Sequence, residues 1–495
     1  MGIDVGTSAV KVVLTGTDGK IISEANVEQS VSHFKPTWAE QDPELWWQNT
    51  VTAINKVTSN LSSLPYPTEL SCIGVTGQMH SSVFLDQSGH SIRPAILWND
   101  SRTISQCKNI YALVGMDFLY QEIGNLALEG FTAPKILWLK ENEPNNYEKL
   151  DTILMPKDYI KYRLTGELST DHSDAAGTIL YNVRNKKWSD KMLETLNIES
   201  KHLPPIYEST DICGSISNIV ASQLGIEKGI PVVCGGADNA VGAVSSGVFA
   251  TGQAQSSLGT SGTLLTPVSN PNVEQDMRLH LFSHCLSDTW YLMGTILSAG
   301  NSLKWLKDNF AADETYETLV NQSINIAPGA EGLIFLPYLN GERTPHNNPK
   351  ARGVFFGIHS GHTLAHFTKA VLEGVCFAIR DTSEIIKTLG VSIKTIRGVG
   401  GGNQNRVWRQ LQADVLNLPI SNVLPGGGPS YGAAMLASVG TGHFFSIKDC
   451  VDQWISETDI VQPKHSNMML YESIYETYKS LYPALKDSFE TFNPR

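Results

Sequence analysis

The sequence has no long apolar segment and few cysteines. None of its apolar runs approaches the roughly 18 residues that a membrane-spanning helix requires. The seven cysteines of the 495-residue chain are scattered and form no Cys-x-x-Cys pair, which argues against a disulfide framework and against a zinc site. No basic segment with an apolar stretch behind it stands at the start, so no signal peptide is expected. We therefore expect a soluble cytoplasmic protein with no membrane partner.

The sequence also has no excess of positive charge. It contains 49 acidic and 37 basic residues, and its formal net charge is −12. A nucleic-acid partner would need a basic face, so we expect none. If the protein handles phosphates, local groups must hold them, because the overall charge would repel them.

Two common nucleotide-binding signatures are absent. The chain contains no G-x-x-x-x-G-K-[ST] segment. Its glycine-rich stretch "GVGGGN" (398–403) fails the pattern G-x-G-x-x-G, because Asn403 stands where the last glycine is required. The sequence therefore supports neither a P-loop nucleoside triphosphatase nor a dinucleotide-binding fold.

A Gly-Thr-Ser turn occurs twice, about half the chain apart. Residues 6–8 form the first copy and residues 259–261 the second, and strand-like residues flank both. Glycine lets a backbone approach a ligand closely, and successive N–H groups form a concavity that binds anions. One copy alone would be an ordinary turn. Two copies, each near the start of its own half, predict a duplicated domain with two phosphate-holding hairpins at one cleft.

Short apolar runs followed by glycine and a helical pattern recur at 72–80, 230–244 and 396–416. This alternation predicts α/β layers with ligands at the carboxyl ends of the strands. The chain is too long for one compact core. We place the boundary between two domains near residue 245, giving domains 1–245 and 246–495.

The two turns and the "GVGGGN" loop resemble the three nucleotide-binding elements of the actin/hexokinase/Hsp70-like (ribonuclease H-like) fold. Within that fold the chain resembles the FGGY family of carbohydrate kinases. "GFTAPKILWLKEN" (130–142) and "GVFFGIHSGHTLAHFTKAVLE" (353–373) match the two signature patterns of that family, and the likeness runs from residue 2 to about 440. The resemblance implies a kinase that uses ATP and Mg²⁺ to phosphorylate a small sugar, and it leaves a homodimer open.

The sugar is suggested by the segment "GQMH" (77–80). Glycerol kinases carry an Arg-Glu pair where Met79-His80 stands, and the chain is similar to the family members that convert D-xylulose to D-xylulose 5-phosphate. Alternatives are another sugar or polyol (L-xylulose, ribulose, gluconate or glycerol), and a non-kinase ATPase of the same superfold. Ser81 and Ala237 stand where the family usually has glycine.

The resemblance implies that Asp238 is the catalytic base. It follows a strand and two small residues, so it would stand at the carboxyl end of that strand, where a carboxylate can take the proton of the attacking hydroxyl. The alternative is that Asp238 caps a helix that begins at Asn239. Asp4 is the expected Mg²⁺ ligand, because Mg²⁺ prefers one or two carboxylates with phosphates and waters. A turn-stabilising role is the alternative for Asp4.

The remaining site residues fall into three groups. Lys11 either reaches the nucleotide or is a surface lysine, and Asn405 either bonds adenine or caps the following helix. A polar loop with Glu342 and Arg343 is expected to border the cleft. The expected phosphate contacts are Gly6, Thr7, Ser8, Lys11, Gly259 and Thr260. The expected adenosine contacts are Gly300, Gly401, Gly402 and Asn405. The expected sugar contacts are Gln78, Met79, His80, Trp98, Asp238 and Asn239.

Overall fold

The computed structural model describes residues 1–59, 69–426 and 428–491. A five-stranded sheet forms the centre of the first half, in the order β15-β5-β1-β2-β3. Its strands are β1 (Gly2–Val5), β2 (Ala9–Thr15), β3 (Ile21–Glu28), β5 (Gly74–Gly77) and β15 (Gly236–Ala237). β2 runs antiparallel to its neighbours β1 and β3, whereas β5 and β15 run parallel to β1.

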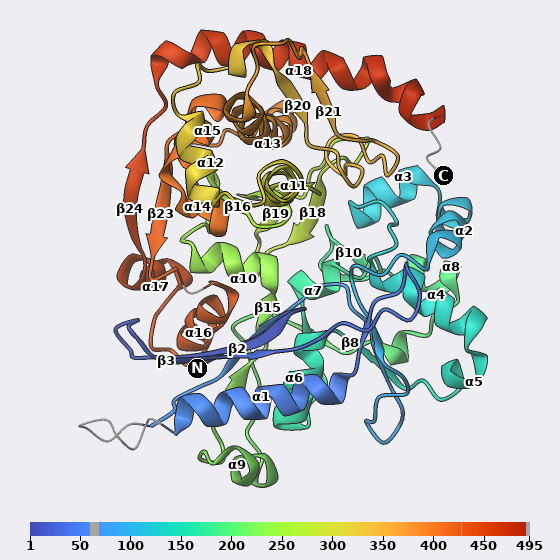
Figure 1. Cartoon of the computed structure of the whole chain (residues 1–495). Helices are drawn as coiled ribbons and strands as arrows, with labels where there is room; N and C mark the ends of the chain where they lie inside the picture. The colour runs from blue at the N-terminus through green and yellow to red at the C-terminus, as the bar shows by residue number, and fades with distance from the viewer. Residues whose placement is uncertain (60–68, 427, 492–495) are drawn as a thin grey trace.

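The second half repeats this arrangement in a seven-stranded sheet. A hairpin of β16 and β17 is extended by antiparallel β19 on one side and by parallel β22 and β23 on the other. The shared strand order confirms the predicted duplication, and the two halves stack one above the other in Figure 1. The strands, in spatial order, are β18 (His280–Ser283), β19 (Trp290–Ile296), β17 (Gly262–Val268), β16 (Gln253–Leu258), β22 (Thr395–Val399), β23 (Ile420–Leu424) and β24 (Ser456–Val461).

Both Gly-Thr-Ser turns join the strands of an antiparallel hairpin, as predicted. Residues 6–8 connect β1 to β2, and residues 259–261 connect β16 to β17. Each turn therefore occupies the same position in its own sheet.

Helices cover both faces of the first sheet. α1 (Pro43–Thr58) begins as predicted, with Asp42 as its N-cap accepting a hydrogen bond from the Glu44 N–H. It packs against β2 and β3, and α16 (Gly428–Gly440) packs against β1 and β5 from the other side (Figure 1). The second sheet is covered by α13 (Leu364–Thr388), which is buried along most of its length.

The chain returns to the first sheet late in its course. α16 and α17 (Ile447–Trp454) belong to the predicted second domain, yet α16 packs on the first sheet and on α10 (Asp238–Ser245), which α17 also contacts. β24 then rejoins the second sheet beside β23, and α18 (His465–Thr491) lies across the top of that half in Figure 1. The boundary near residue 245 stays a prediction.

The segment between β5 and β15 builds a layer of short elements beside the first sheet (Figure 1). In this segment and elsewhere, the further elements are β4 (Glu40–Gln41), β6 (Val83–Leu85), β7 (Ala95–Ile96), α2 (Ile104–Val114), α3 (Met116–Phe118), η2 (Leu119–Ile123), α4 (Thr132–Asn142), α5 (Pro144–Tyr147), β8 (Thr152–Leu154), α6 (Pro156–Thr165), β9 (Thr170–Asp171), α7 (His172–Ala176), β10 (Tyr181–Asn182), β11 (Lys187–Trp188), α8 (Asp190–Leu196), η3 (Ser200–His202), β12 (Ile206–Tyr207), β13 (Ile212–Ser215), α9 (Asn218–Leu224), β14 (Pro231–Val233), α11 (Gly300–Phe310), α12 (Tyr316–Ser323), η4 (Ala330–Gly332), β20 (Ile334–Leu336), β21 (Val354–Phe356) and α14 (Gly401–Gln404).

All seven cysteines are free thiols. Across the part of the chain that the structure describes, no helix combines the length and the apolarity needed to cross a membrane.

Glycines let α16 lie directly on the first sheet. A Cβ atom added at Gly74 would lie 2.0 Å from the carbonyl oxygen of Ala433 in α16, far inside van der Waals contact. Gly242 of α10 faces α16 with more room, because its added Cβ would meet only Pro429, at 3.6 Å.

We predict that Gly74→Ala forces α16 away from the sheet. Overpacking of this kind lowers the free energy of unfolding by about 1–3 kcal/mol. Gly242→Ala is the matched control, since its new methyl group meets α16 without a clash and improves the helix propensity of α10. Urea unfolding of both variants measures the difference, and equal stabilities would contradict the close packing.

Candidate active site

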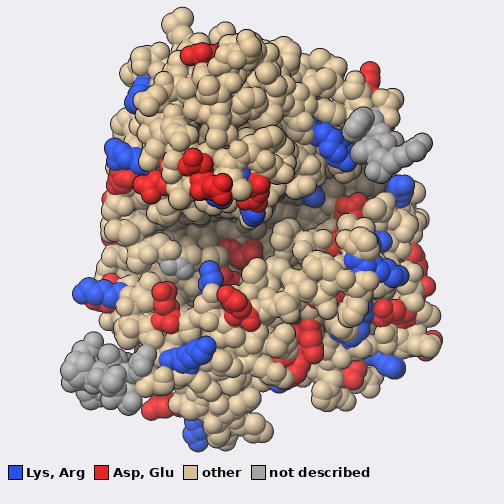
Figure 2. All heavy atoms as spheres, in the orientation of Figure 1, with Lys and Arg blue, Asp and Glu red and all other residues tan. Residues whose placement is uncertain are grey.

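A cavity of about 410 Å³ lies where the two halves meet. Thr7 from the first turn and Ser261 from the second both line it. The molecule is hollowed along the boundary between its upper and lower halves on the face drawn in Figure 2. The two equivalent turns, far apart in sequence, therefore contribute to one cavity, as the duplication predicted.

Two carboxylates lie near the carboxyl ends of two strands of the first sheet. Asp4 is in β1, and Asp238 follows β15 directly as the first residue of α10. In each, Oδ1 is buried and has no hydrogen-bond partner among the described residues. The helix-cap interpretation of Asp238 is wrong, because the N-cap of α10 is Ala237 and the helix has no side-chain cap.

Burial dominates the electrostatics of this pair. It raises the pKa of Asp238 to about 7, and the negative charge of Asp4 adds to the increase. Burial also raises the pKa of Asp4 to about 6, although Lys11, directly opposite on β2, partly offsets this. Two desolvated carboxylates whose charges disfavour each other create a site that favours a proton or a cation.

The residues present fit a magnesium ion only together with phosphate. Mg²⁺ is commonly held by one or two carboxylates, with waters and phosphate oxygens completing its coordination. The unpartnered carboxylate oxygen of Asp4 is chemically suited to that role. No group of three or more His, Cys, Asp or Glu residues within the described ranges could hold a metal by itself.

Thr7 is fixed from two sides. Its hydroxyl donates to Oε1 of Gln78 (3.0 Å) and accepts a hydrogen bond from Nε1 of Trp98 (2.9 Å). The Trp98 side chain, 46% exposed, lines the cavity, whereas Gln78 is buried behind Thr7 and does not reach it. The predicted sugar contact of Gln78 stays a prediction: in this structure its amide bonds Thr7, Ser81 and Gln41. Ser81 in turn accepts from the Trp98 N–H (3.1 Å), so this serine supports the cavity wall.

His80 is neutral and presents an acceptor. Its Nδ1 lies 2.7 Å from the carbonyl oxygen of Gly177, which can only accept, so Nδ1 carries the hydrogen and donates this hydrogen bond. Burial is the main reason that the pKa of His80 falls to about 3, and the positive charges of Lys135 and Arg343 lower it further. With Nδ1 carrying the proton, Nε2 is left as a hydrogen-bond acceptor. Met79, its neighbour in the cavity wall, has its sulfur 3.3 Å from Nδ2 of Asn239.

An aromatic wall stands beside His80. The ring centroid of Phe131 lies 4.6 Å from that of His80, and Phe282 lies 5.8 Å away and stacks on His280. All four line the cavity. Sequence reasoning predicted His80 but missed Phe131, Phe282 and His280. Phe131 could have been found, because it lies inside the signature segment 130–142, but nothing marked Phe282 and His280, which share one face of β18.

The loop after β20 carries an unpaired cation to the cavity. Arg343 lines it, and the described residues offer its guanidinium no hydrogen bond or ion pair. The neighbouring Glu342 is buried and accepts from the N–H groups of Leu297 (2.9 Å) and Arg343 (2.8 Å). Desolvation raises the pKa of Glu342 to about 8, so at neutral pH this carboxyl is mostly uncharged. Glu129, which also lines the cavity, is the other acidic residue whose charge acts on Arg343.

The predicted nucleotide residues of the second half meet around the second turn. The Gly300 N–H bonds the carbonyl oxygen of Gly259 (2.8 Å), and a Cβ at Gly402 would lie 2.8 Å from Leu258. Gly401, in contrast, faces open space. These contacts bring α11, the glycine loop and the turn together.

Several predicted nucleotide contacts are placed differently. Asn405 caps α15 (Arg406–Leu416): its Oδ1 accepts from the N–H groups of Val407 and Trp408, so only its amide nitrogen remains for adenine. Ser261 lines the cavity and its neighbour Thr260 does not, so the predicted phosphate contact of Thr260 stays a prediction. Ser8 and Lys11 are exposed beside Gly6 on the first hairpin.

The comparison with known families accounts for this arrangement. The model of the FGGY carbohydrate kinase N-terminal domain matches residues 1–245, and the model of the C-terminal domain matches residues 254–441. The chain belongs to the FGGY family of carbohydrate kinases. It is a carbohydrate kinase with the two-domain fold of that family.

Relatives of this kinase are similar over almost their whole length. The chain is 39% identical to a xylulose kinase of Bacillus subtilis, over 98% of this chain and 97% of the relative. It is 37% identical to a xylulose kinase of Escherichia coli, over 98% and 99%. The crystal structure of a ligand-bound xylulose kinase from Lactobacillus acidophilus superposes with a TM-score of 0.94 at 26% identity, covering 99% of both chains.

The raised pKa of Asp238 predicts a pH-dependent stability. The folded kinase holds a proton on this carboxyl up to about pH 7, whereas the unfolded chain releases it near pH 4. Between these two values the unfolded chain has lost this proton while the folded kinase still holds it, so raising the pH lowers the free energy of unfolding. Asp238→Asn removes that cost, so its stability relative to the unaltered protein should rise between pH 4 and pH 7 and level off above.

Urea unfolding in the presence of EDTA measures this difference without bound metal. Asp117→Asn, at an exposed position of α3, is the control, and its relative stability should not change over the same window. A pH-independent difference for Asp238→Asn would contradict the assignment of a buried, unpaired carboxyl.

Proposed function

We propose that this kinase transfers the γ-phosphoryl group of ATP to the 5-hydroxyl of D-xylulose, with Asp238 as the general base. The observation that carries the proposal is the unpaired Asp238 carboxylate, placed at a cavity lined by both Gly-Thr-Ser turns. The names of the relatives support D-xylulose as the acceptor.

Asp238 takes the proton of the attacking hydroxyl. Its raised pKa brings its basicity near that needed at neutral pH, where an effective general base has its pKa. Asp238 is half-buried and lines the cavity, and its Oδ1 has no partner in the described chain, so its carboxylate is suited to accept a hydrogen bond from a sugar hydroxyl.

The turns hold the phosphates of ATP. Backbone N–H groups around Gly6 and Gly259 supply donors without side-chain obstruction. The N-terminus of α10, which begins at Asp238, adds the positive end of a helix dipole. Mg²⁺, when held by Asp4 and the phosphates, would neutralise charge on the transferred group. Closure of the two halves would exclude water from the cavity.

The sugar lies between polar and apolar groups. Nε2 of His80 accepts a hydroxyl hydrogen bond, and Asn239 is placed beside Met79 to donate one. The faces of Trp98, Phe131 and Phe282 are suited to the C–H faces of a sugar. Thr7, bonded to Trp98, links the phosphate turn to the sugar wall.

Arg343 binds the end of the sugar remote from the transferred phosphoryl group. The charge that acts on Asp238 is that of Asp4, whereas Arg343 acts on His80 and His280, which places it toward the histidine end. An unpaired guanidinium there can donate two parallel hydrogen bonds to neighbouring oxygens. The keto and hydroxyl oxygens at C2 and C1 of a ketopentose provide such a pair.

Removing the base should slow the chemical step. Asp238→Asn keeps the side-chain shape but cannot accept the proton, so we expect kcat to fall about 10²- to 10⁴-fold with KM for ATP nearly unchanged. Asp381→Asn is the matched control: this carboxyl also has a pKa raised to about 7 by burial, but it bonds Tyr475 outside the cavity. Coupled ADP-release kinetics measure both, and a kcat within a few-fold of normal for Asp238→Asn would remove it as the base.

Among D-xylulose, L-xylulose, ribulose, xylitol, gluconate and glycerol, we expect the highest kcat/KM for D-xylulose. Arg343→Gln should reduce the preference for D-xylulose over xylitol, which has the same carbon chain without the ketone, by about 10-fold or more, since a lost hydrogen bond to a charged group is worth about 1.5–3 kcal/mol. A higher kcat/KM for gluconate or glycerol would reject the substrate assignment. An unchanged ketose preference in Arg343→Gln would reject only the role of Arg343.

A further inference from the structure

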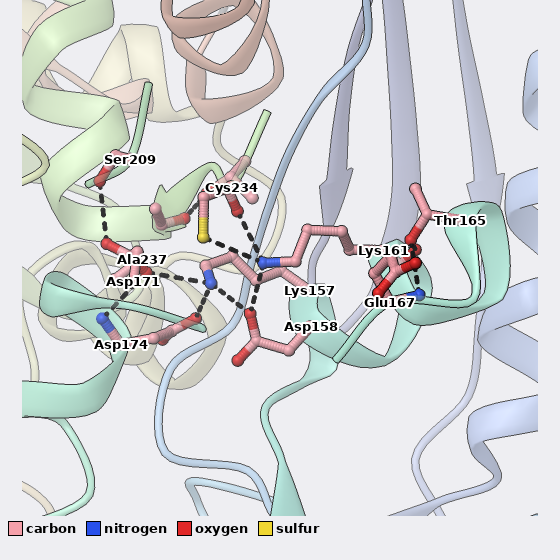
Figure 3. A network of polar contacts seen from close by, with 12 residues as sticks. Lys157, Asp158, Lys161, Thr165, Glu167, Asp171, Asp174, Ser209, Cys234 and Ala237 are labelled. Atoms are coloured by element: carbon pink, nitrogen blue, oxygen red, sulfur yellow. Dashed lines mark hydrogen bonds and ion pairs between the residues drawn. The ribbon is translucent and has the colours of Figure 1, made fainter. Parts of the chain in front are cut away.

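Five charged side chains are buried together close to the backbone that precedes Asp238. They lie on α6, on α7 and at the end of β9 (Figure 3). Nζ of Lys157 lies 2.5 Å from Asp158, 3.0 Å from Asp171 and 3.2 Å from Asp174. Nζ of Lys161 lies 3.3 Å from Asp158. We call these residues the buried lysine cluster: Lys157, Asp158, Lys161, Asp171 and Asp174.

The buried lysine cluster is close to electrical balance. Burial, with help from the neighbouring carboxylates, raises the pKa of Asp174 well above its usual value, which favours the neutral form of this residue. Lys157 and two hydroxyls keep Asp171 ionised, and its pKa is lowered. Two ammonium groups then face two carboxylates with almost no solvent exposure. Such an arrangement tolerates little movement, because a displaced partner would leave a buried charge uncompensated.

The cluster is hydrogen-bonded to the backbone that precedes Asp238. Lys161 donates to the carbonyl oxygen of Cys234 (3.1 Å), four residues before Asp238. One residue before it, the Ala237 N–H donates to Oγ of Ser173 (2.8 Å). The same hydroxyl donates to Oδ2 of Asp171 (2.5 Å), so Ser173 connects the cluster to β15.

Ser173 supplies a partner that the sheet does not. β15 is the edge strand of the first sheet, with β5 on one side only. Ala237 is buried, and its N–H is bonded to Ser173 rather than to another strand. A buried backbone donor without a partner is unfavourable, so this bond fixes the backbone at the residue before Asp238.

Asp238 has little of its own to fix it. Its Oδ1 has no partner in the described chain, and the backbone N–H of the adjacent Asn239 is the one protein hydrogen bond that bears on its pKa. Its place in the cavity therefore depends on the backbone that precedes it. We propose that Ser173, held by Asp171 of the buried lysine cluster, is a positioning residue that aims Asp238 at the sugar hydroxyl. This inference rests on the proposed role of Asp238 as the base.

A double-mutant cycle tests the inference. Ser173→Ala removes the oxygen that holds Ala237, and a base misplaced by about 1 Å can cost about 10²-fold in rate. We expect kcat to fall about 10- to 100-fold in Ser173→Ala, with KM for ATP and for the sugar nearly unchanged. In the Asp238→Asn background the same substitution should lower the residual kcat by less than about 3-fold, because residues that act as a unit are not additive.

Ser209→Ala is the matched control. The Ser209 hydroxyl donates to the same oxygen of Asp171 (2.9 Å) but does not contact Ala237, so this variant should retain its kcat. Thermal melting of each variant identifies loss of folding. If Ser173→Ala is unstable, Ser173→Cys takes its place, because a thiol is only a weak acceptor.

Each outcome decides one question. Normal kcat in Ser173→Ala, or equal losses in both backgrounds, would overturn the positioning role while leaving Asp238 as the base. Equal losses in Ser173→Ala and Ser209→Ala would also overturn it, because the effect would then belong to Asp171. Normal kcat in Asp238→Asn would instead reject the proposed function on which the inference rests.

Discussion

The burial of two carboxylates without partners is the constraint on which the active site depends. Asp4 and Asp238 come from the central strand and the edge strand of one sheet, and each has an oxygen that the described chain leaves unbonded. Folding must therefore compensate an unfavourable pair from elsewhere in the molecule. A ligand that brings a cation or a hydroxyl relieves the same pair, so the disfavoured arrangement in the free protein is also the source of its binding capacity.

The first sheet can hold this arrangement because it is tightly supported. Gly74 lets α16 lie against β5 at backbone contact distance, and α16 also packs against α10, which begins at Asp238. On another side, Lys161 bonds the backbone of Cys234 and Ser173 bonds that of Ala237. The backbone on both sides of Asp238 is thus supported by packing and by hydrogen bonds, whereas Oδ1 of Asp238 has no partner among the described residues.

Hydrogen bonds connect the first Gly-Thr-Ser turn to the cavity wall around Trp98. The Thr7 hydroxyl is shared by Gln78 and Trp98, and Ser81 bonds both Gln78 and the Trp98 backbone. A serine where the FGGY family usually has glycine therefore has a structural role in this chain. A change in the position of Trp98 would be transmitted to Thr7 through direct hydrogen bonds, which offers a physical route by which sugar and nucleotide binding could influence each other.

The sequence by itself determined the family, the duplicated hairpins and the position of Asp238, because these depend on local patterns: a repeated Gly-Thr-Ser turn, strand–glycine–helix alternation and two long signature segments. It also indicated Met79, His80 and Trp98, each next to a recognisable motif. Only the tertiary structure decided what the side chains do. Gln78 bonds Thr7 and Gln41 beside the cavity, and Asn405 caps a helix because the first turn of α15 offers it two N–H groups. Phe282, His280 and Ser173 carry no local signal, since the residues beside which they act, His80 for the first two and Ala237 for Ser173, lie more than 60 positions away in the chain. The return of α16 to the first sheet is equally invisible to local patterns, because it depends on which apolar faces pack once both sheets exist.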